Sequence, residues 1–254
     1  MSDEQLAGHA EACRKLHTLK DGAFTLIKDS LAEGPGVTEQ DVRNHLLERM
    51  SAMGLVTDGD EPIVGVNAHA ATPHYCTTPG TNVTIKKGDL ILIDLWARHP
   101  EGIYADITWM AYAGEEVPAK HAERFALICR ARDETLAYLR REIASGRYPR
   151  GRDADKVARD IISDAGHNES FIHNLGHSID TDVHGSSTNL NGYSNADTRR
   201  VHDRLLFSVE PGIYLEGEAG YRTEIDVYIR DGAVIVTGPI QRAITPLLDK
   251  NSNI

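Results

Sequence analysis

Cysteine is scarce in this chain. Three cysteines occur among 254 residues, at positions 13, 76 and 129. An odd number of widely spaced cysteines makes neither a disulfide framework nor a CxxC metal site. Because oxidising compartments favour disulfides, we expect reduced thiols and a cytoplasmic protein.

Long apolar runs and an excess of basic residues are also absent. No run approaches the roughly 20 apolar residues that span a membrane, and the start MSDEQLAGHAEACRK lacks the apolar core of a signal peptide. The 38 Asp and Glu residues outnumber the 27 Lys and Arg residues, for a formal net charge of −11. This balance argues against binding to nucleic acid or to an anionic membrane. The remaining composition, 41% hydrophobic and 26% charged, is that of a soluble globular enzyme.

The stretch DLILIDLWARHPEGIYADITWMAYAG, residues 89–114, predicts two strands joined by a turn. If Asp94 pairs directly with Asp106, the turn is centred on Pro100. Two carboxylates would then lie opposite each other among apolar neighbours, which is costly unless a cation lies between them or one is protonated. The alternative is that the strand ends at Asp94 and the acids face water.

Helical periodicity predicts four helices in two pairs. The first pair covers residues 3–33 and a helix that is capped by Thr38 and ends at Gly54; the second covers residues 118–145 and a helix from Asp153 to Gly166. The pairs match at an offset of 112 residues, which also aligns His9-Ala10-Glu11 with His121-Ala122-Glu123. A repeat of this length favours two α/β halves, about 1–115 and 116–254, in one domain with a site between them.

Other segments carry narrower expectations. His9 and His121 are expected to face solvent, the run from Tyr221 to Ile229 to form one strand, and the polar tail from Asp249 to be frayed.

The second half offers its own acids and histidines. Glu210 and Glu224 lie on predicted strands 14 residues apart, much as Asp94 and Asp106 are 12 apart, and SFIHNLGHSIDTDVHG adds three histidines. Four carboxylates and one imidazole suit two divalent ions, and oxygen-rich ligation with one nitrogen favours Mn, Fe, Co or Zn. Such a pair of ions activates water and polarises a carbonyl.

These motifs together resemble the pita-bread metallopeptidases of family M24. The resemblance rests on Asp94, Asp106, GHSID, VEPG and YRTEID in this order, and it covers nearly the whole chain. The family includes methionine aminopeptidase, aminopeptidase P, prolidase and creatinase. VEPGIY, the Arg-x-Glu of YRTEID and the PHY that ends at Tyr75 look closer to the aminopeptidase P and prolidase branch.

The resemblance implies an α/β (α+β) pita-bread fold and a role for each motif residue. Two divalent ions would be held by Asp94 on one side, by His177 and Glu210 on the other, and by Asp106 and Glu224 as bridges. The water bridging them, as hydroxide, would attack the scissile carbonyl, with Glu210 as proton shuttle. The remaining roles are substrate binding and oxyanion stabilisation by His74 and His184, pocket lining by His173 and Trp96, and bracing of the carboxylates by Arg222 and Thr108.

The implied function is an exopeptidase, an Xaa-Pro aminopeptidase or dipeptidase, acting on short peptides and open to assembly as a homodimer. GHSID and VHG depart from the usual GHGIG and VHE, which leaves substrate identity open. No separate N-terminal domain is expected. A hydrolase or lyase for a small non-peptide metabolite is the alternative, and a non-catalytic binding module is a third, disfavoured because all five ligands are present.

Overall fold

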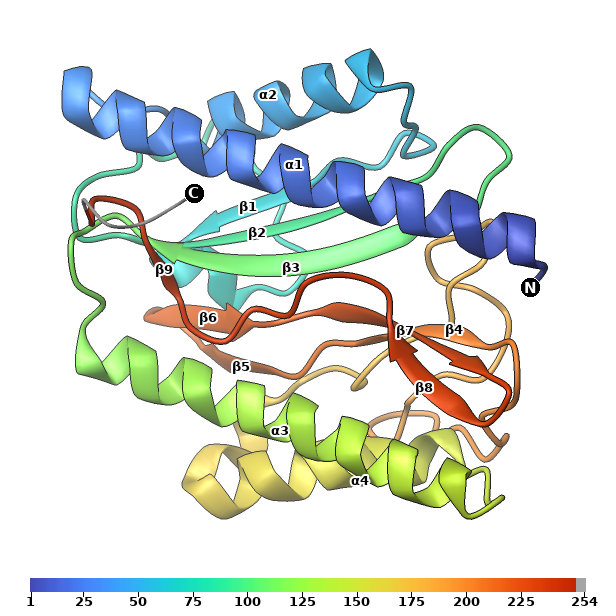
Figure 1. Ribbon diagram of the computed structural model, residues 1–254. Coiled ribbons are helices and arrows are strands. Elements are labelled where there is room, and N and C mark those ends of the chain that lie inside the picture. Colours follow the sequence, from blue (N-terminus) through green and yellow to red (C-terminus); the bar gives the residue numbers. More distant parts are fainter. Residues whose placement is uncertain (250–254) are drawn as a thin grey trace.

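Two helix pairs flank a layer of β-sheet in the computed structural model, which describes residues 1–249 (Figure 1). The predicted tail after Asp249 lies outside these residues. The helices are α1 (Asp3–Glu33), α2 (Glu39–Ala52), α3 (Ala119–Ala144) and α4 (Gly151–Ile162), and short helical turns follow at Asn67–Ala71 (η1), Ser163–His167 (η2) and Asn168–Ser170 (η3). None of the helices in this range is long and apolar enough to span a bilayer.

The four predicted helices are confirmed, with both boundaries of the last one shifted. Helix α4 ends at Ile162, whereas the predicted end, Gly166, lies in the turn η2 with a φ of +86°. Thr38 caps α2 as predicted, in a capping box with Asp41. Helix α4 begins two residues before the predicted start because Asp153 occupies its third position, where its carboxylate accepts a hydrogen bond from the Arg150 backbone N–H at 3.2 Å. An acid in the first turn therefore indicated that a helix begins here, but it did not identify the first residue of the helix.

Three sheets lie between the helix pairs. The first contains β1 (Ile63–Val66), β2 (Leu90–Ala97), β3 (Ala105–Tyr112) and β9 (Thr245–Pro246) in that order. The second has the order β4 (Leu206–Val209), β7 (Ile225–Arg230), β8 (Ala233–Val236), and the third pairs β5 (Gly212–Leu215) with β6 (Ala219–Arg222). In Figure 1, α1 and α2 cover one side of this layer, and α3 and α4 cover the other.

Alternation along β2 divides the core in two. Ile91, Ile93 and Leu95 pack with α1 and α2, whereas Leu92 belongs to the cluster packed with α3 and α4. Because successive side chains of a strand point to opposite faces, Asp94 shares the face of Leu92 and is turned toward the second half of the chain. This orientation brings the acids of the first half to the junction between the halves.

The predicted pairing of Asp94 with Asp106 is wrong. Strands β2 and β3 pair Asp94 with Thr108 and Trp96 with Asp106, so the turn is centred on Glu101, whose φ is +59°. All four residues still share one face, because a shift of two residues preserves the side-chain alternation. The composition of the turn located its centre to within one residue, but it did not fix the register of the two strands.

The predicted strand from Tyr221 to Ile229 is interrupted. β6 ends at Arg222 and pairs with β5, while β7 begins at Ile225 and pairs with β4. At the break, the Glu224 backbone N–H donates to the carbonyl of Thr108 in the first sheet, over 3.2 Å. The interruption thus joins the two halves and carries Glu224 to the acids of β3.

His9 and His121 are buried, against expectation. His9 Nδ1 donates to the carbonyl of Tyr104 at 2.7 Å, and its Nε2 lies 2.9 Å from the Thr237 hydroxyl. His121 Nδ1 lies 2.8 Å from the Tyr221 hydroxyl. Each long helix therefore uses its repeated histidine to bind strand or loop residues beneath it, since buried polar groups need such partners.

Candidate metal centre and substrate pocket

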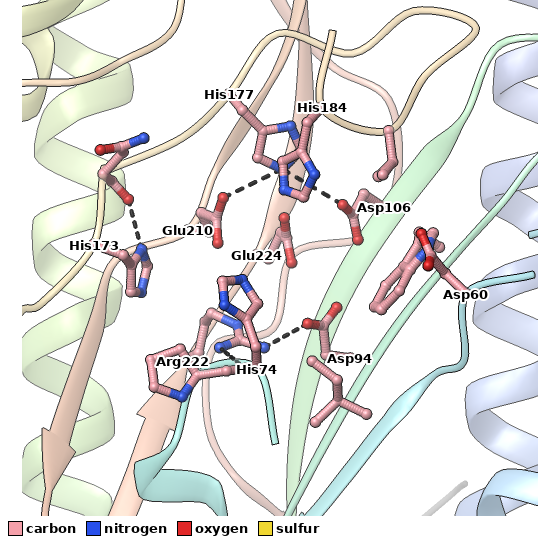
Figure 2. A pocket seen from close by; sticks show the side chains of 15 residues that line it. Asp60, His74, Asp94, Asp106, His173, His177, His184, Glu210, Arg222 and Glu224 are labelled. Carbon is pink, nitrogen blue, oxygen red and sulfur yellow. Dashed lines mark hydrogen bonds and ion pairs between the residues drawn. The ribbon is translucent and has the colours of Figure 1, made fainter. Parts of the chain in front are cut away.

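A pocket of about 320 Å³ lies at the junction of the two halves (Figure 2). Every predicted site residue lines it except Thr108, which is fully buried and donates to the Glu224 carboxylate at 2.7 Å. The lining residues come from both halves of the chain: Asp60, Ile63, Pro73, His74, Asp94, Trp96, Asp106, His173, Asn174, His177, Val183, His184, Glu210, Arg222 and Glu224.

Three side chains in this pocket have the spacing of a metal site. Ligand atoms of Asp106, His177 and Glu224 all lie within 4.8 Å of one another. His177 Nε2 is 3.6 Å from Asp106 Oδ2 and 3.4 Å from Glu210 Oε1. Within residues 1–249, the buried Oδ1 atoms of Asp94 and Asp106 have no hydrogen-bond partner. Unpaired buried carboxylate oxygens beside an imidazole fit a divalent cation, which would supply the missing partner.

The pKa shifts of these acids also favour a bound divalent cation. Burial raises the pKa of Asp94, Asp106 and Glu224, and for the last two the neighbouring carboxylates raise it further. Burial also raises the pKa of Glu210 to about 8, although the Arg222 guanidinium opposes the shift. Burial without a counter-charge therefore disfavours the ionised form of these acids, whereas divalent cations favour it.

His177 presents its Nε2 atom to the carboxylates. Its Nδ1 lies 3.2 Å from the carbonyl of Ser178 and donates to it, which leaves the lone pair on Nε2. Burial, followed by the neighbouring His184, lowers the pKa of His177 to about 3, so the imidazole is neutral. A neutral imidazole with its second nitrogen hydrogen-bonded is the usual form of a metal ligand.

Arg222 and Thr108 hydrogen-bond to the acids of the pocket. The guanidinium binds Asp94 through Nη2 and donates from Nε to Thr108 Oγ1 at 3.0 Å. Thr108 in turn donates to Glu224 at 2.7 Å. This chain of hydrogen bonds fixes two carboxylates from different strands relative to each other.

His173 lines the pocket with both ring nitrogens already occupied. Its Nδ1 donates to the carbonyl of Asn174 at 2.7 Å, so its Nε2 accepts from the Tyr214 hydroxyl at 2.7 Å. Tyr214 accepts in turn from Arg222 Nη1 at 2.9 Å. His173 therefore offers a ligand its ring rather than a free nitrogen, while His74 and His184 are exposed at the mouth.

Sequence reasoning missed three residues of the site. Tyr214 follows VEPG in the motif VEPGIY, which was a usable signal. Asp226 is buried and accepts from the Asp106 backbone N–H at 2.9 Å, and it lies only two residues after Glu224. Asp60 lines the pocket from a loop that carries no motif, so nothing in the sequence singled it out.

Comparisons with known proteins identify the family of this chain. Residues 10–231 match the model of Metallopeptidase family M24. An uncharacterized peptidase of Staphylococcus saprophyticus is 30% identical over 230 residues, which cover 91% of this chain and 60% of that protein. The chain thus spans about three-fifths of the length of this curated relative.

Solved structures share the fold. The X-Pro aminopeptidase from Thermotoga maritima superposes with a TM-score of 0.81 at 24% identity, covering 97% of this chain and 64% of that one. The Xaa-Pro dipeptidase from Bacillus anthracis gives 0.76 at 26% identity, covering 96% and 63%. Because the family model matches most of this chain, the chain belongs to metallopeptidase family M24 and has the pita-bread fold.

Proposed function

We propose that this protein is a dinuclear-metal-dependent exopeptidase that cleaves short peptides, with a preference for Xaa-Pro bonds. The observation that carries the proposal is the gathering of four carboxylates and one imidazole in a single pocket. Names of similar structures, X-Pro aminopeptidase and Xaa-Pro dipeptidase, support the choice of substrate.

The five ligands would hold two divalent ions, of Mn, Co, Fe or Zn. Asp94 would serve one ion, His177 and Glu210 the other, and Asp106 and Glu224 both. When bound, the ions supply an activated water and a Lewis acid for the scissile carbonyl. Because the ligands come from both halves, we infer that the halves act as one catalytic unit.

The remaining chemistry is assigned to the chain's own side chains. Glu210 accepts a hydrogen bond from the Ser208 hydroxyl at 3.0 Å, and we assign it the transfer of a proton from the attacking water to the leaving amine. Burial lowers the pKa of His184, so its neutral ring keeps one N–H for the carbonyl oxygen as that oxygen gains charge. His74, on the loop after η1, is assigned the same task.

Pocket size favours short substrates. A volume of about 320 Å³ lies at the small end of the roughly 300–1,000 Å³ usual for ligand pockets. Trp96 and the ring of His173 form part of its wall, which suits a compact proline ring beside the scissile bond.

Hydrolysis of a peptide panel by chelator-stripped protein tests this function. Dipeptides and tripeptides with and without proline at the second position are offered after addition of Mn, Co, Fe or Zn. We expect metal-dependent cleavage of the Xaa-Pro members, and loss of both metal occupancy and activity in Asp106→Ala. Metal binding without cleavage of any peptide would contradict the proposal and favour a hydrolase or lyase for a small non-peptide metabolite.

A further inference from the structure

The loop before β1 contains three acids, two of which are paired. Asp58 binds the guanidinium of Arg98, with Oδ2 and Nη2 2.8 Å apart. Glu61 binds Arg43 Nη1 at 2.6 Å. For the carboxylate of Asp60, between them, residues 1–249 provide neither a hydrogen bond nor an ion pair. Asp60 is the member of this group that lines the pocket.

The backbone holds Asp60 in place. Its N–H donates to the carbonyl of Thr57 at 3.1 Å, and the Thr57 hydroxyl donates back to the carbonyl of Asp60 at 2.6 Å. Figure 2 shows Asp60 on the side of the pocket away from His173, beyond Asp94 and Asp106. Its carboxylate is close enough to His184 for its charge to act on that imidazole's pKa. The side chain therefore faces the space that a substrate would enter.

Charge and surroundings indicate what this carboxylate would bind. Two divalent ions would offset the four ligand carboxylates, and Arg222 already binds Asp94. Asp60 keeps an uncompensated negative charge. The same pocket has the indole of Trp96 and the apolar side chains of Ile63 and Val183 in its wall. An aromatic face and apolar walls near a carboxylate suit a cation on an aliphatic stem, such as a lysine or arginine side chain.

We propose that Asp60 is a specificity-determining residue that selects peptides with a lysine or arginine side chain within two residues of the scissile bond. This inference rests on the proposed peptidase function and names the substrate class of the same site. Complementary charge in a partly enclosed pocket discriminates against a neutral side chain of equal size.

Matched peptides test this selectivity in the metal-loaded full chain. Arg-Pro-Ala is compared with citrulline-Pro-Ala, and Ala-Pro-Arg with Ala-Pro-citrulline, because citrulline keeps the shape of arginine without its charge. The free amino terminus is common to all four peptides and cancels in each ratio. We expect kcat/KM to favour arginine by about tenfold in one pair.

Two variants of the same loop decide the role of Asp60. In Asp60→Asn the ratio should fall to near one, and folding should be unaffected because this carboxylate has no partner in the described chain. Glu61→Gln, one residue away and outside the pocket, should keep the wild-type ratio. Equal kcat/KM for arginine and citrulline in both wild-type pairs, or an unchanged preference in Asp60→Asn, would overturn the inference.

A binding measurement separates this inference from the proposed function. If none of the four peptides is cleaved, the peptidase proposal fails, and calorimetric Kd values for the same peptides then test Asp60 alone. About tenfold tighter binding of an arginine peptide, lost in Asp60→Asn, would support the selectivity. Equal affinities, or no measurable binding of either arginine peptide, would refute it.

Discussion

Replacement of Asp106 by asparagine should separate two effects of the acidic cluster: the free-energy cost of its buried charge and its contribution to metal binding. Asp106 is buried, its Oδ1 has no partner within residues 1–249, and burial and neighbouring carboxylates raise its pKa well above the usual range. In the metal-free protein this side chain is therefore destabilising in its charged form. An amide of the same shape removes that charge while leaving the backbone bond to Asp226 intact.

The magnitude follows from ligand linkage. A cation at about 100 times its Kd adds about 2.7 kcal/mol to the unfolding free energy. For a domain of this size each kcal/mol raises Tm by about 2–4 °C, so Mn²⁺ should raise the wild-type Tm by roughly 5–10 °C. Asp106→Asn should lose most of this increase, and its metal-free Tm should stay within about 3 °C of the metal-free wild type.

Calorimetric scans of chelator-stripped protein, with and without Mn²⁺, provide the assay. Glu142→Gln makes the same carboxylate-to-amide change at an exposed helix end, where Glu142 pairs with Arg147, and should keep the full metal-dependent increase. A metal-induced increase of wild-type size in Asp106→Asn would refute the assignment of Asp106 as a shared ligand. A metal-free variant that unfolds 10 °C lower would refute the claim that the uncompensated charge is a cost.

Three further substitutions test other parts of the structure. Thr108→Val removes the hydroxyl that donates to Glu224, so titration calorimetry should show about 10- to 100-fold weaker Mn²⁺ binding, with Thr108→Ser near wild type. Gly220→Ala places a Cβ on the carbonyl oxygen of Ala70, and urea unfolding should show a loss of about 1–3 kcal/mol or more; an unchanged midpoint would contradict this packing. Burial lowers the pKa of His17 to about 4 from 6.5, so the unfolded chain binds more protons between these values and stability falls as pH drops through them. Urea unfolding at pH 7 and pH 5 should show that the wild type loses about 2 kcal/mol more unfolding free energy than His17→Phe over this range. An equal loss in the two proteins would count against this role of His17.

Much of the fold could be predicted because it depends on local patterns. Periodicity located all four helices, and side-chain alternation placed Asp94 and Asp106 on one face of a hairpin. These signals are local in the chain, since a helical or strand face is set by residues a few positions apart. The identities of the candidate ligands were also readable, because each lies in a short motif.

Long-range pairing could not be predicted from the same patterns. Alternation survives a shift of two residues, so it did not distinguish Asp94 opposite Asp106 from Asp94 opposite Thr108. Similarly, the apolar alternation from Tyr221 to Ile229 continues through the break at Glu224, although the residues before and after the break pair with different sheets. Only the packing of the two halves determines where the pairing partner changes.

The sequence by itself determined the helix pairs, the faces of the strands and the acids and histidines available for metal binding. The tertiary structure alone decided which of them lie together in one pocket. It turned His9 inward to the carbonyl of Tyr104, used both nitrogens of His173, and left the Asp60 carboxylate beside the pocket without a partner from residues 1–249. The rings of His9 and His173 each have a partner 40 or more residues away, Tyr104 and Tyr214, and burial and hydrogen bonding between distant segments are not encoded in local periodicity.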